Sequence, residues 1–225
     1  SKFIIILMKA FIVAEIASNW EGNMSKAKKL ILNCKNAGAN AVKFQIWRAE
    51  DLYQKDHPEW INILKSELSF KKIKILKTYC DSIGIEFFAS VFYPEAVEFL
   101  ESIKVKRYKI ASRTCTLKDP YSIETIEKIG ITKKPTIISM GMGGNKKMIK
   151  QKISNNKDLF CYCISKYPTK ISEINWKKAM EYNGFSDHTL GFTAPIIFAV
   201  LHKQKGTKNI FIEKHVKNKN SKGPD

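Results

Sequence analysis

The chain of 225 residues is poor in arginine, although its net charge is strongly positive. Its only arginines are Arg48, Arg107 and Arg113, while 39 basic residues stand against 21 acidic ones and give a formal charge of +18. Specific recognition of phosphates and guanine edges depends largely on the bidentate arginine fork, and the many lysines are scattered along the chain. The charge therefore does not predict nucleic-acid binding, whereas anionic small-molecule substrates remain compatible with it.

Long hydrophobic runs are also missing. The longest early apolar stretch, residues 3–8 and 11–14, is interrupted by Lys9 and closed by Glu15, well short of the roughly 20 apolar residues that span a bilayer. No small-residue cleavage site follows it, so no signal peptide is predicted. With 44% hydrophobic residues, 27% charged residues and no low-complexity tract, the composition predicts a soluble globular protein without a membrane partner.

Paired cysteine motifs are absent. The five cysteines are an odd number and contain no C-x-x-C pair, which argues against a disulfide framework. We expect small buried hydrophobic residues in a reducing cytoplasm, and hence a cytoplasmic protein. Cys161 and Cys163 fall on the same face of a predicted strand, where core packing is the simpler interpretation. There is likewise no Walker loop, no G-x-S-x-G elbow and no dinucleotide fingerprint.

Short β-rich runs alternate with helical patterns from one end of the chain to the other. Such alternation is typical of βαβ units and a parallel sheet, an α/β fold. The predicted strands cover residues 11–17, 41–45, 86–90, 107–111, 136–139, 159–164, 184–186 and 210–214. Eight strands predict a (β/α)8 TIM barrel, a fold of typically ~250 residues. An open doubly wound sheet is the alternative, because periodicity does not report closure.

The helical patterns carry recognisable end signals. Ser25 is the predicted N-cap of the first helix and Gly38 its C′ residue; Gly84 ends a second helix, and Pro94 suits the first turn of a third. Residues 3–8 would form an extra strand or hairpin at the barrel floor. Because Asp225 comes just after the eighth strand, we expect one barrel domain over residues 1–225, C-terminally truncated and lacking the final helix.

Polar side chains stand at the carboxyl ends of the predicted strands, where barrel enzymes place their active sites. In strand order they are Glu15, Lys43, Gln45, Ser90, Lys109, Ser112, Ser139, Ser165, Tyr167, Ser186, Asp187, His188, Lys214 and His215. A lysine within a strand is costly to bury unless it meets an anion. Lys43 and Lys109, together with the serine hydroxyls, therefore predict a phosphate or carboxylate site. The alternative is that each lysine pairs internally with a barrel carboxylate such as Glu15.

Two of the four histidines follow adjacent strands. His188 and His215 would meet at the same part of the rim, and two neutral imidazoles suit a divalent transition metal. His57 and His202 have no such placement and receive no role. The glycines of residues 141–144 either donate backbone N–H groups to a phosphate or shape a tight loop.

Several segments together resemble the phosphoenolpyruvate-dependent sialic acid synthases, also called N-acetylneuraminate or nonulosonic acid synthases. The segments, in chain order, are residues 14–16 (AEI), 38–45 (GANAVKFQ), 108–112 (YKIAS), 139–142 (SMGM), 186–191 (SDHTLG), 213–215 (EKH) and 223–225 (GPD). The resemblance implies a barrel transferase that condenses phosphoenolpyruvate with an N-acetylated amino sugar, such as N-acetylmannosamine, to a nine-carbon 2-keto acid, with release of phosphate.

The resemblance also implies roles for individual residues. Glu15, His188 and His215 would be catalytic, and the two histidines would hold the metal, Mn²⁺ or Mg²⁺, which polarises the sugar aldehyde. The residues implied to bind the phosphate and carboxylate are Lys43, Ser90, Lys109, Ser112, Ser139, Ser165 and Ser186. Those implied to orient the sugar, besides Glu15, are Gln45, Tyr167 and Asp225.

The chain departs from the family pattern at three places. Trp20 stands where the family has a histidine near the sugar, and Arg113 and Thr114 replace a Gly-Glu pair that follows Ser112. In the family a small antifreeze-like domain usually follows the barrel and reaches into the partner's active site in a homodimer; we expect this chain to lack it. Arg113 and the surplus lysines favour an alternative synthase that uses a phosphorylated aldose. A further alternative is a catalytically incomplete barrel that binds an anionic ligand or a partner subunit.

Overall fold

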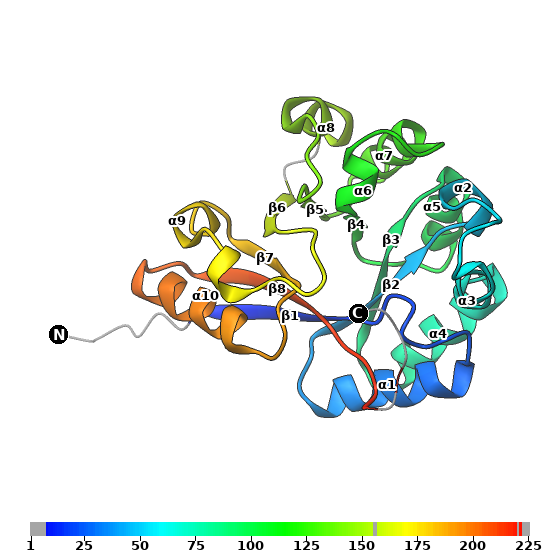
Figure 1. Cartoon of the computed structure of the whole chain (residues 1–225), viewed down its shortest axis with the longest axis horizontal. Helices are drawn as coiled ribbons and strands as arrows, with labels where there is room; N and C mark the ends of the chain where they lie inside the picture. Colours follow the sequence, from blue (N-terminus) through cyan, green and yellow to red (C-terminus); the bar gives the residue numbers. More distant parts are fainter. Residues whose placement is uncertain (1–7, 155–156, 220, 222–225) are drawn as a thin grey trace.

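Eight parallel strands close into a barrel in the computed structural model, which describes residues 8–154, 157–219 and 221 (Figure 1). The strands are β1 Lys9–Glu15, β2 Ala41–Ile46, β3 Glu86–Val91, β4 Tyr108–Ile110, β5 Thr136–Ser139, β6 Asp158–Cys163, β7 Gly184–Asp187 and β8 Asn209–His215. Closure comes from β1, which pairs with β2 on one side and with β8 along its whole length on the other. The predicted TIM barrel is confirmed, and the open-sheet alternative is wrong.

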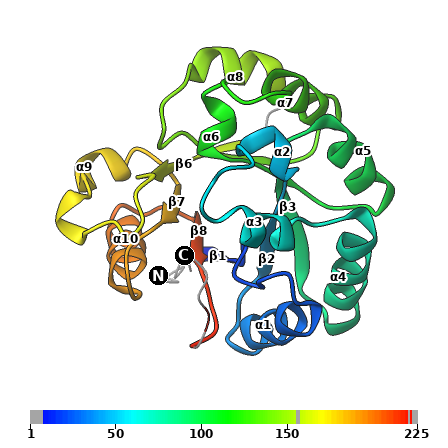
Figure 2. The ribbon, with the colours of Figure 1, turned by 45° about the vertical axis from the view of Figure 1, so that its right-hand side comes forward.

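Helices surround the strands (Figure 2). They are α1 Met24–Asn36, α2 Ala49–Leu52, α3 Trp60–Ser66, α4 Phe70–Ile83, α5 Pro94–Ser102, α6 Ser112–Cys115, α7 Ser122–Ile131, α8 Lys146–Ile153, α9 Trp176–Ala179 and α10 Thr193–Gln204. Within the described residues after β8, 216–219 and 221, there is no further helix. None of the helices in the described ranges is long and apolar enough to cross a bilayer.

The end signals of the helices were mostly interpreted correctly. Gly38 and Gly84 have φ values of 87° and 70°, which suit glycine at a helix end, and Pro94 opens α5. The predicted cap of α1 was wrong: Asn23, two residues before Ser25, accepts a 3.0 Å hydrogen bond from the backbone N–H of Lys26. Both residue types cap helices well, so the choice depended on where the preceding turn ended.

The first strand ends two residues earlier than predicted. Ala17 has a φ of 46°, outside the β region, and its N–H donates a 2.7 Å hydrogen bond to the Glu15 carboxylate. The chain therefore turns as soon as Glu15 has been placed at the end of β1. The other predicted strands agree with the observed ones to within one residue at each end.

The barrel interior is layered because side chains along a strand alternate between its two faces. An apolar layer fills the middle, and its buried members are Val13, Ala41, Phe88, Ile137, Cys161 and Phe211. Two residues further along the strands, the inward side chains become polar, as with Val13 and Glu15 on β1 or Phe211 and Glu213 on β8. The apolar layer closes the barrel below, and the polar layer opens toward the carboxyl ends.

The outward side chains pack against the helices. The largest apolar cluster joins β1–β5 to α1, α4, α5, α7 and α8, and a second joins β6–β8 to α9 and α10. Cys34, Cys80, Cys115 and Cys161 are buried, as expected. The extra strand predicted from residues 3–8 lies outside the described residues except for Met8, which belongs to no strand.

Candidate active site

A cavity of about 370 Å³ lies at the carboxyl ends of the strands. It is lined by every predicted site residue that the structure describes: Glu15, Lys43, Gln45, Ser90, Lys109, Ser112, Ser139, Ser165, Tyr167, Ser186, His188 and His215. Asp225 lies outside the described residues. Among the other strand-end residues, Asp187 and Lys214 do not line the cavity and pair with each other at 2.6 Å. The sequence thus identified residues that line one cavity, and their roles stay predictions.

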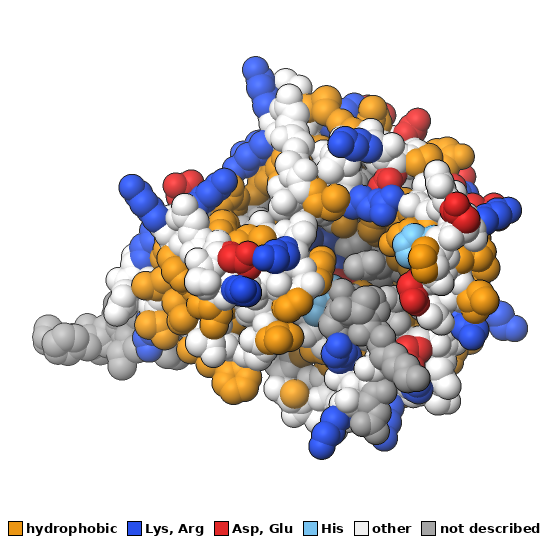
Figure 3. All heavy atoms as spheres, in the orientation of Figure 1, with side chains coloured by type: hydrophobic (Ala, Val, Ile, Leu, Met, Phe, Trp, Pro, Cys, Tyr) orange, Lys and Arg blue, Asp and Glu red, His pale blue; other side chains and the backbone are white. Residues whose placement is uncertain are grey.

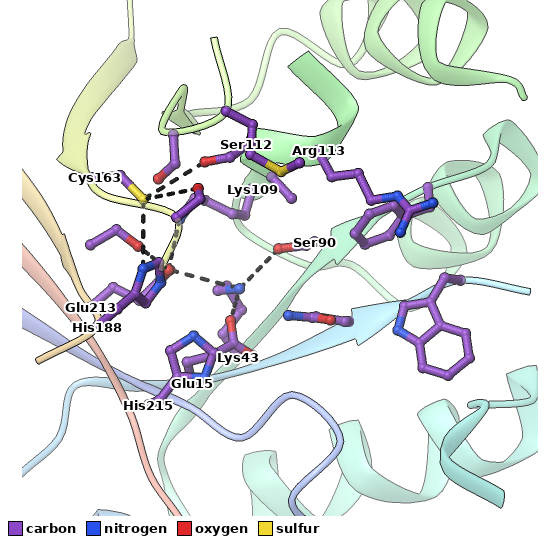
Figure 4. A pocket seen from close by; sticks show the side chains of 18 of the residues that line it. Glu15, Lys43, Ser90, Lys109, Ser112, Arg113, Cys163, His188, Glu213 and His215 are labelled. Atoms are coloured by element: carbon purple, nitrogen blue, oxygen red, sulfur yellow. Dashed lines mark hydrogen bonds and ion pairs between the residues drawn. The ribbon is translucent and has the colours of Figure 1, made fainter. Parts of the chain in front are cut away.

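Two buried lysines at the base of the cavity are paired with two buried carboxylates (Figure 4). Lys43 forms an ion pair with Glu15 on the neighbouring strand, and Lys109 contacts Glu213 at 2.8 Å across the barrel interior. Lys43 also lies 3.7 Å from Glu213, so the four groups form one network. The alternative that the lysines pair internally is confirmed, and Glu213, which sequence reasoning left without a role, completes it.

This network is charge-balanced at neutral pH. Burial opposes the charged form of Glu213, but Lys109 and Lys43 outweigh it and hold the pKa of this carboxyl well below its ordinary value. Burial likewise opposes the charge on Lys109, and Glu213 outweighs it and raises the pKa of the ammonium group. Two positive and two negative charges therefore lie at the cavity base. The other basic side chains are spread over the face of the molecule that Figure 3 shows. The excess positive charge of the chain is not concentrated in the site.

The serine hydroxyls differ in how they are used. Ser90 accepts a hydrogen bond from Lys43 at 2.9 Å, and Ser186 donates one to Glu213 at 2.7 Å. Ser112 accepts one from the backbone N–H of Gly141 at 3.0 Å. Ser139 is only 3% exposed, and its hydroxyl has no hydrogen-bond partner among the described residues. A buried hydroxyl that faces a cavity without a partner is costly unless a ligand or water completes it.

The glycine loop after β5 shapes the cavity wall. A Cβ at Gly141 would lie 2.5 Å from the hydroxyl of Ser165 and 3.0 Å from the sulfur of Cys163. Gly144 has a φ of 118°, and a Cβ there would lie 2.4 Å from the carbonyl of Cys115. Because the Gly141 N–H is bonded to Ser112, the structure favours the interpretation of a tight loop over that of a phosphate cradle.

The two predicted metal-ligand histidines lie side by side. The ring centroids of His188 and His215 are 5.2 Å apart, and the ring of Tyr167 packs against both at 4.1 and 5.4 Å. Nδ1 of His188 lies 2.5 Å from the carbonyl oxygen of Ile164, which only accepts hydrogen bonds. Nδ1 therefore carries a proton, so that Nε2 is the nitrogen that the neutral ring would offer to a metal.

The fit of a metal to this pair can be judged from the donor set. No group of three or more histidine, cysteine, aspartate or glutamate side chains within the described ranges is arranged around a metal position. Two adjacent imidazoles, one of them with a fixed tautomer, suit a divalent transition metal such as Mn²⁺ that takes its remaining ligands from water and substrate oxygens. His188 and His215 fit such a cation.

Cys163 is a cavity residue, and the interpretation that both strand-β6 cysteines are core packing is wrong for it. It lines the cavity and lies two residues beyond the buried Cys161 on β6. Its sulfur is 3.7 Å from the hydroxyl of Ser112 and 4.0 Å from Nδ1 of His188. Burial opposes the thiolate, but His188 outweighs it and lowers the pKa of Cys163. Burial likewise opposes the charged form of His188, and the contacts with Cys163 outweigh it and raise the pKa of the imidazole.

We expect Cys163 to be the one thiol of the native protein that reacts rapidly with a thiol reagent at pH 8. Burial raises the pKa of Cys34 to about 11 and those of Cys80 and Cys115 to about 12, and it also raises that of Cys161. Counting thiols with 5,5′-dithiobis(2-nitrobenzoic acid) before and after denaturation measures this. Cys163→Ser should remove the fast phase, and a fast phase that persists in this variant would contradict the prediction.

Two departures from the family pattern lie differently from what the resemblance implied. Trp20 is fully buried in the apolar cluster and does not line the cavity. Arg113 does line the cavity, but Asp119 holds its guanidinium through two hydrogen bonds of 2.7 and 2.9 Å. Thr114 is buried and does not line the cavity.

Sequence reasoning also missed an apolar part of the cavity lining. Its members are Trp47, Leu52, Tyr53, Phe92, Ala111 and Met142. They follow β2, β3, β4 and β5 in the loops and short helices of the mouth. For Trp47, Phe92 and Ala111 the available signal was their position directly after a strand end; nothing in the pattern singled out the others.

Comparison with known proteins gives a consistent set of relatives. A family model described as the NeuB family matches residues 30–225. An uncharacterized protein of Methanocaldococcus jannaschii is 35% identical over 96% of this chain and 64% of its own length. The N,N'-diacetyllegionaminic acid synthase of Legionella pneumophila is 32% identical, over 97% of this chain and 67% of its own length. The chain thus spans about two thirds of the length of these curated relatives.

A solved structure supports the same grouping. The N-acetylneuraminic acid (sialic acid) synthetase of Leptospira borgpetersenii superposes with a TM-score of 0.76 at 26% sequence identity. The match covers 92% of this chain and 73% of that protein. The shared part includes the barrel on which the cavity is built.

Proposed function

This chain belongs to the NeuB family, and from that we propose that it carries the barrel of a synthase that condenses phosphoenolpyruvate with an N-acetylated amino sugar. The product would be a nine-carbon 2-keto sugar acid together with phosphate. One observation supports this most directly: two buried lysines, five serine hydroxyls and two adjacent imidazoles line a single cavity. Such a donor set suits a doubly anionic substrate that reacts beside a cation.

In this proposal the phosphoenolpyruvate lies over the cavity base. Lys43 and Lys109 supply fixed ammonium groups, and the hydroxyl of Ser139 supplies a hydrogen bond that no described residue takes. Glu15 and Glu213 already balance the two lysines, so the pocket alone does not offer the excess positive charge that the anion needs. We therefore expect the anion to bind strongly only with an added cation.

His188 and His215 would hold that cation, Mn²⁺ or Mg²⁺. When bound, it supplies Lewis-acid polarisation of the sugar aldehyde and offsets the charge of the anion. The hydrogen bond from His188 Nδ1 to the carbonyl of Ile164 fixes the ring so that Nε2 is presented as a ligand. Tyr167 packs against both rings and restrains their orientation.

The remaining chemistry depends on positioning. The enol carbon of phosphoenolpyruvate forms a bond to the aldehyde carbon, water adds at C2, and the tetrahedral intermediate collapses with cleavage of its C–O bond to phosphate. Glu15 and Gln45 would orient the sugar from neighbouring strands, while the serines and lysines hold the phosphate in place. Binding both substrates in one cavity makes their encounter effectively unimolecular, and the fixed charges stabilise the developing ones.

Calorimetric titration of phosphoenolpyruvate tests the proposal. We expect binding with Mn²⁺ that weakens by at least about tenfold in EDTA, because the lysine charges are already compensated. Binding of equal strength in EDTA would contradict the charge argument. No binding in either condition would instead favour a catalytically incomplete barrel. Phosphate release on adding N-acetylmannosamine, measured in the same samples, tests the condensation itself.

A further inference from the structure

We propose that the mouth of the cavity opposite the histidines selects an aldose with an uncharged, partly apolar far end and discriminates against sugar phosphates. The selecting wall consists of Arg113, neutralised by Asp119, and the apolar residues around it. This inference rests on the proposed function, because it concerns the sugar that would react in the same cavity.

Arg113 lies across the barrel from the histidine pair. It belongs to α6, directly after β4, whereas His215 ends β8, and strands four apart in a closed eight-stranded barrel are on opposite sides. Figure 4 shows Arg113 at the far side of the pocket from His188 and His215. An open-chain sugar whose aldehyde carbon reacts beside the histidines would therefore extend its far carbons toward Arg113.

The guanidinium of Arg113 is already engaged. Nε and Nη2 donate to the two carboxylate oxygens of Asp119, and Nη2 also donates to the carbonyl oxygen of Leu52 at 2.7 Å. The side chain of Asp119 is only 13% exposed, so solvent does little to separate the pair. The ring of Tyr53 lies 5.2 Å from the guanidinium carbon. This cation is compensated by a fixed carboxylate, which leaves little net positive charge for another anion.

The surroundings of Arg113 are apolar and aromatic. Arg113 contacts Leu52 and Tyr53, and Trp47 and Phe92, which also line the cavity, pack in the same apolar cluster as Leu52. Trp47 and Tyr53 make an edge-to-face contact with ring centroids 6.2 Å apart, which stiffens this side of the cavity. A methyl or acyl group can pack on such a surface, whereas a phosphate monoester would lose hydration and gain no uncompensated positive charge.

The compensation of Arg113 therefore argues against the alternative of a phosphorylated aldose, which was based on Arg113 and the surplus lysines. A sugar phosphate near Arg113 would also approach the carboxylate of Asp119, and like charges placed together are strongly unfavourable. Removing the negative charge of Asp119 should reverse this preference, because Arg113 would then become an uncompensated cation beside the sugar.

Sugar binding can be measured without turnover through Cys163. Because this thiol lines the cavity, a bound sugar should slow its labelling. The probes are N-acetylmannosamine, its 6-deoxy derivative and its 6-phosphate, each titrated with Mn²⁺ present and without phosphoenolpyruvate, so that no condensation takes place. We expect the unmodified chain to bind the 6-deoxy sugar at least about tenfold more tightly than the 6-phosphate.

Two substitutions test the wall itself. Asp119→Asn should shift the binding ratio toward the 6-phosphate by about tenfold or more, and Arg113→Met should weaken the 6-phosphate further while sparing the 6-deoxy sugar. The matched control is Asp51→Asn, which frees Arg48 from a similar 2.7 Å pair outside the cavity lining and should leave the ratio unchanged.

The outcomes separate the two proposals. Tighter binding of the 6-phosphate by the unmodified chain, or an unchanged ratio in Asp119→Asn, would overturn the inference. Protection by none of the three sugars would overturn it as well, because a wall that contacts the sugar must bind it. Binding in the expected order by a chain that releases no phosphate once phosphoenolpyruvate is added would support the wall and count against the condensation activity alone.

Discussion

Lys109→Met is expected to lower the free energy of unfolding by about 3–5 kcal/mol, because it leaves Glu213 buried without its main partner. Glu213 is 3% exposed, and Lys109 approaches it to 2.8 Å from the opposite side of the barrel. The same variant should also lose binding of phosphoenolpyruvate, since Lys109 lines the cavity. Urea unfolding measures the first effect and calorimetric titration the second.

A double variant separates stability from ligand binding. Lys109→Met with Glu213→Gln removes both charges and keeps an oxygen that can accept from Ser186, so most of the lost stability should return without phosphoenolpyruvate binding. Lys55→Met is the control, because its pair with Glu50 has side chains 74% and 68% exposed and should contribute little. A Lys109→Met protein as stable as its parent would contradict the buried network.

The second large effect concerns the histidine pair. His188→Ala and His215→Ala should each weaken Mn²⁺ binding by more than about 100-fold. Loss of a residue that only hydrogen-bonds to a metal ligand lowers metal affinity by up to about 100-fold, and loss of a ligand itself should lower it further. Both variants should also stop phosphate release, because the aldehyde would lose its polarising cation. Calorimetric titration of Mn²⁺ into the chain without substrates measures the binding step separately from activity.

Another histidine provides the matched control. His57 is exposed and does not line the cavity, so His57→Ala should bind Mn²⁺ and release phosphate as the parent does. Undiminished Mn²⁺ affinity in either His188→Ala or His215→Ala would remove that residue from the metal site. Far-UV circular dichroism of each variant would show that the barrel had remained folded.

The fold was predictable because the information that carries it is local. Strand and helix patterns repeat with short connections, and turn signals such as Gly38 and Gly84 mark their boundaries. Boundaries failed where two local signals competed, as at the cap of α1. Closure of the barrel depends on β1 meeting β8, two strands at opposite ends of the chain, and no local pattern reports that contact.

The site was predictable in position but not in its electrostatics. Counting side chains at strand ends located the cavity residues, since carboxyl ends of parallel strands meet on one side of a barrel. The same alternation could have drawn attention to Cys163, two residues beyond the apolar Cys161, and to Glu213, two residues before His215. What it could not reveal was that Glu213 compensates a lysine 104 residues away.

The sequence by itself determined the succession of eight βα units and which side chains stand at the carboxyl ends of the strands, because strand periodicity assigns each residue to a face. Only the tertiary structure decided which charges neutralise one another: Glu15 with Lys43, Glu213 with Lys109 and Asp119 with Arg113. The interaction of two charges depends on their separation and burial, and for residues on different strands and loops these quantities exist only once the barrel has closed. In the folded barrel, two lysines and an arginine without an evident partner in the sequence are each paired with a carboxylate, and the cavity is charge-balanced.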